Sequence, residues 1–112
     1  MARVKFLSDW SQEQDGDIRA GDSLLIEYVR ARPSPGYVSG YTNYNPGRSI
    51  IVSARFHPHG QEVSHSVDFD GSATVRVPSG ATKIELWFKK TDEEGTVSWD
   101  SQYGQNYWFD VT

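Results

Sequence analysis

Turn-forming residues interrupt this chain at short intervals along its whole length, and that feature constrains its fold more than any other. The segments between the turns alternate apolar and polar side chains with a period of two residues, which is typical of strands. No window combines a helical period with helix-capping residues. The pattern predicts an all-β fold. Turns are expected at 15–17, 33–36, 45–47, 58–60, 70–71, 78–80 and 93–95.

The length of 112 residues suits one domain, 1–112, with a single hydrophobic core. We predict an antiparallel β-sandwich of the immunoglobulin-like type, with about seven or eight strands. The expected strands are 2–8, 23–30, 49–57, 62–69, 72–77, 82–90, 96–100 and 105–111.

The strand expected at 82–90 makes a register prediction. Trp87 shares its side of the strand with charged residues, whereas Phe88 shares its side with Ile84 and Leu86. We therefore expect Phe88 in the core and Trp87 partly exposed.

Composition excludes several classes of function. The chain has no cysteine, so it forms neither disulfides nor thiolate metal sites. Its net charge of −4 and its lack of clustered Lys and Arg argue against a nucleic-acid partner. No window is apolar enough to span a membrane, and the first residues do not form a signal peptide. A cytoplasmic location is the default expectation, and self-association into a homo-oligomer stays open.

No catalytic motif is present. The chain lacks the GxSxG elbow of serine hydrolases and both glycine-rich phosphate-binding motifs. Its carboxylate pairs lie in or beside turns, where solvated acids are common. We expect a protein that is not an enzyme and that uses no cofactor.

The histidines offer a weaker alternative. His57, His59 and His65 surround the turn at 58–60, and a hairpin there could bring His57 and His65 together. Imidazoles suit zinc, but no recognised ligand spacing is present. Ordinary polar residues of a turn and sheet are the simpler interpretation, with no metal expected.

Aromatic and amide side chains carry the strongest functional signal. They gather in two stretches, WDSQYGQNYW at 99–108 and the long segment 31–48. Sugars present apolar C–H faces edged by hydroxyls, so flat rings beside Asn and Gln suit them. The candidate ligand-binding residues are Tyr37, Tyr41, Tyr44, Trp87, Gln102, Tyr103, Gln105 and Asn106.

Within 99–108, structural roles are assigned separately. Trp99 and Tyr107 are expected to anchor the stretch in the sandwich. Asp100 and Asn106 are expected to bond backbone amides of the loop between them. Gly104 is expected to adopt a backbone conformation that a β-carbon disfavours.

The spacing W-D-x-x-x-G-x-N-Y, from Trp99 to Tyr107, resembles the terminal motif of carbohydrate-binding module family 21. The preceding ELWFKK at 85–90 is similar to the strand before that motif, and the match covers about 82–111. The resemblance implies an immunoglobulin-like sandwich that binds starch or glycogen without catalysis. FHPHGQEV and the C-terminal segments also resemble a family of small bacterial proteins of unknown function.

We therefore predict a non-catalytic carbohydrate-binding module, lectin-like, with α-glucan as one candidate ligand. The alternative is a structural or protein-interaction module whose aromatic loops contact a protein partner. The metal-binding hypothesis at the three histidines is the weakest of the three.

Overall fold

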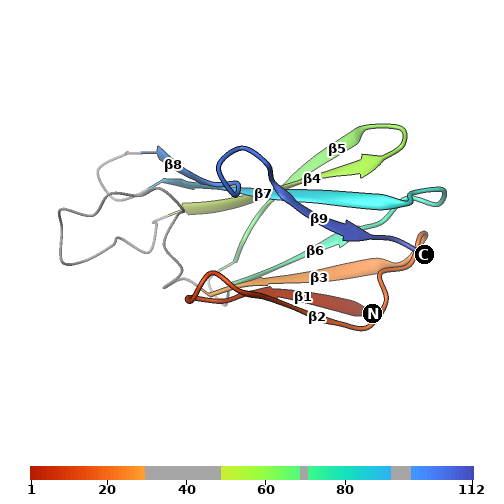
Figure 1. Cartoon of the computed structure of the whole chain (residues 1–112), viewed down its shortest axis with the longest axis horizontal. Helices are drawn as coiled ribbons and strands as arrows, with labels where there is room; N and C mark the ends of the chain where they lie inside the picture. Colours follow the sequence, from red (N-terminus) through yellow and green to blue (C-terminus); the bar gives the residue numbers. More distant parts are fainter. Residues whose placement is uncertain (30–48, 69–70, 92–96) are drawn as a thin grey trace.

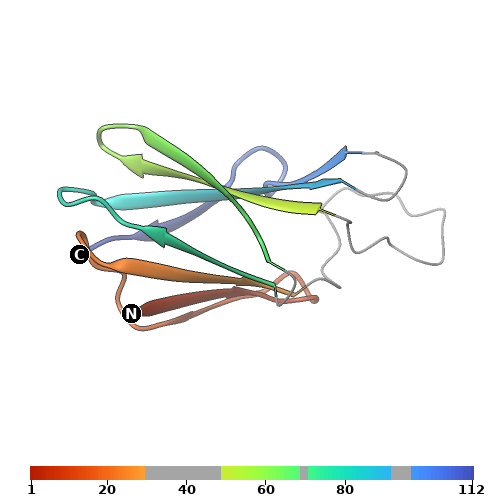
Figure 2. The ribbon, with the colours of Figure 1, turned by 180° about the vertical axis from the view of Figure 1, so that it is seen from behind.

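The computed structural model describes residues 1–29, 49–68, 71–91 and 97–112. These residues form two packed sheets and no helix (Figure 1). The view from behind shows the same two layers (Figure 2). The strands are β1 (Ala2–Phe6), β2 (Gln12–Asp15), β3 (Ser23–Tyr28), β4 (Ser49–His57), β5 (Gln61–Ser66), β6 (Ser72–Arg76), β7 (Lys83–Thr91), β8 (Val97–Asp100) and β9 (Tyr107–Asp110).

Sheet A has the order β2-β1-β3-β6, and sheet B has the order β5-β4-β7 with β8 and β9 both paired to β7. Strand β8 covers one half of β7 and β9 covers the other half. Among the described strands every pairing is antiparallel except that of β1 with β3, which is parallel. The predicted all-β sandwich is confirmed, while its immunoglobulin-like character stays a prediction.

The described residues form nine strands, more than the expected seven or eight, because β2 carries no strand pattern in its sequence. All four side chains of β2 are polar and exposed, so the strand has no apolar alternation. It forms because its backbone pairs with β1 at the edge of sheet A. Edge strands of this kind are commonly polar, which discourages pairing with other chains.

Aromatic side chains form the centre of the core. The ring of Phe6 on β1 lies 4.8 Å from that of Phe88 and 5.0 Å from that of Tyr107, centroid to centroid. Tyr28 on β3 lies 4.4 Å from Phe88. The register prediction for β7 is confirmed, because Phe88 is fully buried and Trp87 is only partly buried. Each fully buried Phe stabilises the fold by about 1.5–3 kcal/mol.

One buried carboxyl group joins the two sheets. Asp100 on β8 is fully buried, and its side-chain oxygens accept hydrogen bonds from two tyrosine hydroxyls. Tyr28 of sheet A donates over 2.6 Å, and Tyr107 of sheet B donates to the other oxygen. Buried Lys90 places its amine 5.0 Å from the centre of the Tyr28 ring. This polar group at the core thus ties β3 to β8 and β9.

Replacing Asp100 by alanine should destabilise the protein by roughly 3–5 kcal/mol, because it leaves two buried hydroxyls without their acceptor. Urea unfolding measures this as a lower midpoint. Asp110→Ala, at an exposed position on β9, is the control and should change the midpoint little. Adding Tyr28→Phe and Tyr107→Phe to Asp100→Ala should recover part of the loss. A triple variant no more stable than Asp100→Ala would contradict this account.

Candidate functional site

Three of the chain's four tryptophans lie on the outer face of sheet B. Trp87 belongs to β7 itself. Trp99 on β8 pairs with Lys89 of β7, and Trp108 on β9 pairs with Glu85 of β7. Trp99 is 51% exposed and Trp108 is 50% exposed. We call this surface the tryptophan face; it comprises Arg55, His57, Glu85, Trp87, Lys89, Trp99, Asn106 and Trp108.

A basic or imidazole side chain lies against each of these tryptophans. The guanidinium of Arg55 lies 5.2 Å from the centre of the Trp87 ring, and the amine of Lys89 lies 5.9 Å from that of Trp99. The His57 ring stacks on Trp108 with centroids 5.0 Å apart and planes 28° apart. The cation–π contacts of Arg55 and Lys89 contribute about 0.5–1 kcal/mol each at exposed sites. Together with the stack of His57 they fix the ring orientations. The face therefore presents oriented rings beside hydrogen-bond donors.

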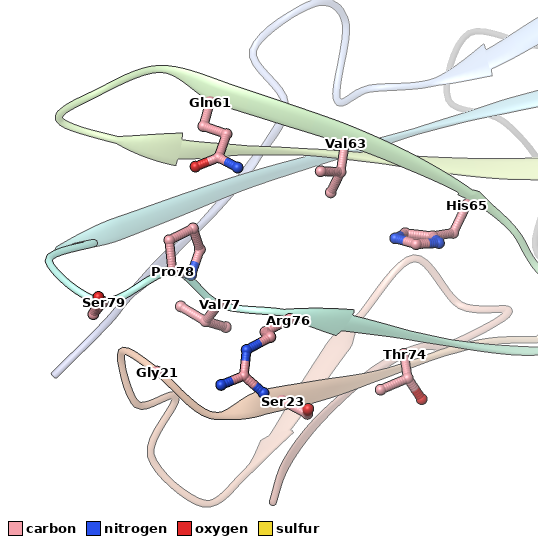
Figure 3. A pocket seen from close by; sticks show the side chains of 10 residues that line it. All are labelled: Gly21, Ser23, Gln61, Val63, His65, Thr74, Arg76, Val77, Pro78 and Ser79. Carbon is pink, nitrogen blue, oxygen red and sulfur yellow. The ribbon is translucent and has the colours of Figure 1, made fainter.

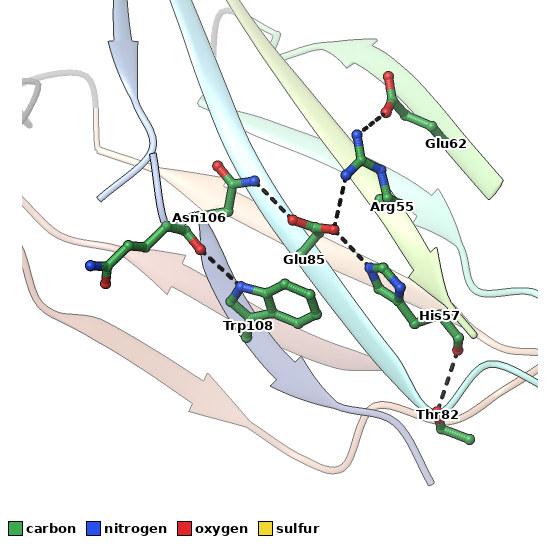
Figure 4. Close-up of polar contacts among 8 residues, drawn as sticks. Arg55, His57, Glu62, Thr82, Glu85, Asn106 and Trp108 are labelled. Atoms are coloured by element: carbon green, nitrogen blue, oxygen red, sulfur yellow. Dashed lines mark hydrogen bonds and ion pairs between the residues drawn. The ribbon is translucent and has the colours of Figure 1, made fainter. Parts of the chain in front are cut away.

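Glu85 is the buried acid at the centre of the polar part of the face (Figure 4). Its Oε1 lies 2.7 Å from Nε2 of His57 and 3.3 Å from Nη1 of Arg55, while Oε2 accepts from Nδ2 of Asn106 over 2.8 Å. Arg55 also bonds Glu62 at 2.9 Å. Burial raises the pKa of Glu85, but the hydrogen bonds from Asn106 and His57 and the charge of Arg55 outweigh burial and hold that pKa below its usual value.

The loop 101–106 joins β8 to β9 and is closed by its own bonds. The carbonyl of Ser101 accepts from the amides of Gly104 and Asn106 over 3.0 and 2.7 Å, and Gln102 Nε2 donates to the Asn106 carbonyl over 2.8 Å. Gln102, Tyr103, Gly104 and Asn106 all have positive φ. Positive φ is uncommon outside glycine and persists only where surrounding contacts impose it. The loop is therefore a tightly bonded unit.

The roles predicted for three residues of this stretch, Trp99, Asp100 and Asn106, are wrong. Trp99 does not anchor the sandwich, because β8 directs it outward and Asp100 inward. Asp100 bonds tyrosine hydroxyls in the core, and Ser101 closes the loop in its place. Asn106 reaches the side chain of Glu85 where a backbone amide was expected. The buried position of Tyr107 and the positive φ of Gly104 are confirmed.

The candidate ligand-binding residues fall into three groups. Gln102, Tyr103 and Gln105 are exposed on the loop, with Tyr103 at 75% exposure. Asn106 and Trp87 belong to the tryptophan face. The loop 101–106 also contacts this face through Gln105, whose backbone carbonyl accepts a hydrogen bond from Nε1 of Trp108 over 2.8 Å. Tyr37, Tyr41 and Tyr44 lie outside the described residues.

Sequence reasoning missed the central Glu85 as well as Arg55, Lys89 and Trp108, and it misplaced Trp99. A signal for Trp108 was present, because Tyr107 and Phe109 mark the inner side of β9 and so direct Trp108 outward. No such signal existed for Trp99, because the inner side of β8 carries Ser98 and Asp100, which are polar.

The three histidines are not brought together. His65 pairs with Val52 across the β4–β5 hairpin, while His57 lies beyond the paired residues. His65 therefore points to the inner side of sheet B and His57 to the outer side. His59 is exposed in the turn between them. Among the described residues no three His, Asp or Glu side chains are grouped so that they could hold a metal ion.

The lowered pKa of Glu85 predicts a pH-dependent stability. Its stabilising effect is complete above the unfolded-state pKa of about 4.3 and is lost as pH falls through the lower folded-state pKa. Glu85→Gln should therefore be less stable than the original chain at neutral pH, and the difference should shrink below about pH 4. Urea midpoints measured across this range test the idea. Arg55→Gln should move the acid loss of stability to higher pH, and a pH-independent difference would refute the assignment.

Within the described residues no helix is long and apolar enough to cross a membrane. Comparison with curated proteins finds no match, and comparison with solved structures finds none either. A family model described as "Family of unknown function (DUF6209)" matches residues 1–112, the whole chain. The chain therefore belongs to this family of unknown function, DUF6209.

Proposed function

We propose that this protein is a non-catalytic carbohydrate-binding module whose binding site is the tryptophan face. The observation that carries the proposal is the grouping of Trp87, Trp99 and Trp108 on one side of sheet B, beside a buried and fully bonded Glu85. Aromatic rings that stay half exposed lose part of the stabilisation that burial would give, so their clustering on one face calls for a ligand.

The energetics of sugar binding favour several rings acting together. Covering about 60–80 Å² of apolar sugar face contributes roughly 1.5–2 kcal/mol, whereas association costs about 4 kcal/mol or more. One ring is insufficient, and two or three rings with hydrogen bonds are sufficient. Arg55, His57 and Asn106 supply polar groups beside the rings, and Glu85 holds all three in place.

The spacing of the rings favours an oligosaccharide over a single sugar. Trp108, Trp87 and Trp99 stand at the levels of residues 85, 87 and 89 of β7, which span about 13 Å along the strand. A ligand that contacts all three must extend over that length. The resemblance to starch- and glycogen-binding modules makes α-glucan the first candidate, and exposed Trp99 is the motif residue best placed to meet it.

The arrangement of Glu85 favours binding over hydrolysis. A general acid needs a raised pKa and a free proton to donate. Glu85 has a lowered pKa, and its oxygens are held by three partners. It is suited to fixing neighbouring side chains.

The binding test uses maltoheptaose as the α-linked probe and cellohexaose as the β-linked probe, after a glycan array has ranked other sugars. We expect Trp99→Ala and Trp108→Ala each to weaken binding of the responding probe about tenfold or more. Trp10→Ala is the matched control, since Trp10 is 49% exposed on the β1–β2 turn of the other sheet. It should leave affinity unchanged, and Tyr103→Ala should keep its stability while weakening binding.

The second candidate is a protein-interaction surface, because exposed Trp and Arg are the residues most enriched at the centres of protein interfaces. Sedimentation of the same variants separates the two functions and tests for a homo-oligomer. If no glycan binds and Trp108→Ala dissociates an oligomer, the tryptophan face is an interface between copies of the chain, and the carbohydrate proposal is wrong.

A further inference from the structure

A concave surface lies at the edge of the sandwich, away from the tryptophan face. It is an open cleft of about 690 Å³ between β5 of sheet B and β6 of sheet A (Figure 3). The side chains of Gln61, Val63 and His65 point into it from β5. Thr74 and Arg76 line it on β6 from the outer side of sheet A, with Arg76 directed toward Ser23 (Figure 3). Its volume is within the range of about 300–1,000 Å³ that is typical of small-molecule sites. The cleft shares no residue with the tryptophan face.

The cleft exists because sheet B extends beyond the edge of sheet A. Gln61, Val63 and His65 pair with Phe56, Ala54 and Val52, which are all buried. Cross-strand partners share a face, so these β5 side chains point toward the interior. No strand of the described part of sheet A lies beyond β6 to cover them, and Gln61 and His65 are exposed. Polar residues thus occupy positions that strand geometry directs inward.

The charge of the cleft differs from that of the whole chain. The chain carries 15 acidic and 11 basic residues, yet none of the described residues that line the cleft is acidic. The side chain of Arg76 makes no ion pair or hydrogen bond with any other described residue. Arg3 and Arg55, in contrast, each pair with two carboxylates. A guanidinium at the wall of an acid-free cleft is suited to an anionic ligand.

We propose that the β5–β6 cleft binds a small hydroxylated carboxylate of the size of one acidic monosaccharide, such as a hexuronic acid. Arg76 takes the carboxylate in a two-pronged hydrogen bond. Gln61, His65 and Thr74 bond the hydroxyls, and Val63 contacts the C–H face of the ring. This site goes beyond the proposed function and does not depend on it.

A carboxylate fits the cleft better than a phosphate does. A phosphate monoester carries a charge of about −1.5 to −2 near neutral pH and is typically held by helix N-termini or by nests of backbone amides. The described lining of the cleft offers one arginine, one histidine, amide and hydroxyl side chains, and no helix. One guanidinium balances the single charge of a carboxylate.

The test is a titration of the full chain followed by amide chemical shifts, with galacturonate, galactose and inorganic phosphate as separate probes. We expect galacturonate to bind in the millimolar range or tighter and to shift amides of β5 and β6. Galactose, which lacks the carboxylate, should bind at least about tenfold more weakly. Phosphate that binds as tightly as galacturonate would overturn the assignment to a carboxylate.

Arg76→Gln should weaken galacturonate binding about tenfold or more, and Arg76→Lys should lose part of the affinity because it keeps the charge without the fork. Arg19→Gln, at an exposed arginine outside the cleft, should leave binding unchanged. Trp99→Ala should also leave it unchanged, which separates this site from the tryptophan face. The proposal fails if galacturonate does not bind or binds no better than galactose. It also fails if Arg76→Gln, shown to be folded by an unchanged melting temperature, binds galacturonate as well as the original chain does.

Discussion

The buried carboxyl of Asp100 is the contact on which the C-terminal half of sheet B depends. It accepts hydrogen bonds from Tyr28 in sheet A and from Tyr107 in sheet B, so it fixes β8 and β9 against the core at once. Strand alternation then determines their neighbours. Because Asp100 points inward, Trp99 points outward, and because Tyr107 points inward, Trp108 also points outward. The exposed tryptophans are therefore a consequence of the polar group in the core.

Glu85 plays the corresponding part on the outer face. A carboxylate that is mostly shielded from water is stable only where its oxygens are bonded. Here two segments bond it: strand β4 supplies Arg55 and His57, and the loop 101–106 supplies Asn106. The bond from Asn106 attaches the loop 101–106 to the sheet, while His57 stacks on Trp108. The two acids together hold the aromatic rings in position before any ligand arrives, which lowers the entropy cost of binding.

The sequence predicted those parts of the molecule that follow from local alternation. Phe88 inward and Trp87 outward follow from their neighbours on β7, and the structure places them so. The outward orientation of Trp99 and the inward orientation of Asp100 could not be predicted in the same way. An aspartate buried beside Ser98 contradicts the local pattern, and its partner Tyr28 lies 72 residues away. Strand β2 was missed because a polar edge strand is specified by its pairing with β1 and by no pattern of its own.

The overhang of β5 beyond sheet A has two physical explanations, and Arg76 separates them. An exposed edge strand needs polar side chains to prevent pairing with other chains, and Gln61, Glu62 and His65 satisfy that need wherever they point. Edge protection is served equally well by acidic side chains, which this chain has in excess. It does not require that the lining be free of acids or that an arginine on the opposite strand lack a described partner. Those two features concern the described lining of the cleft, so recognition of an anion explains them and edge protection alone does not.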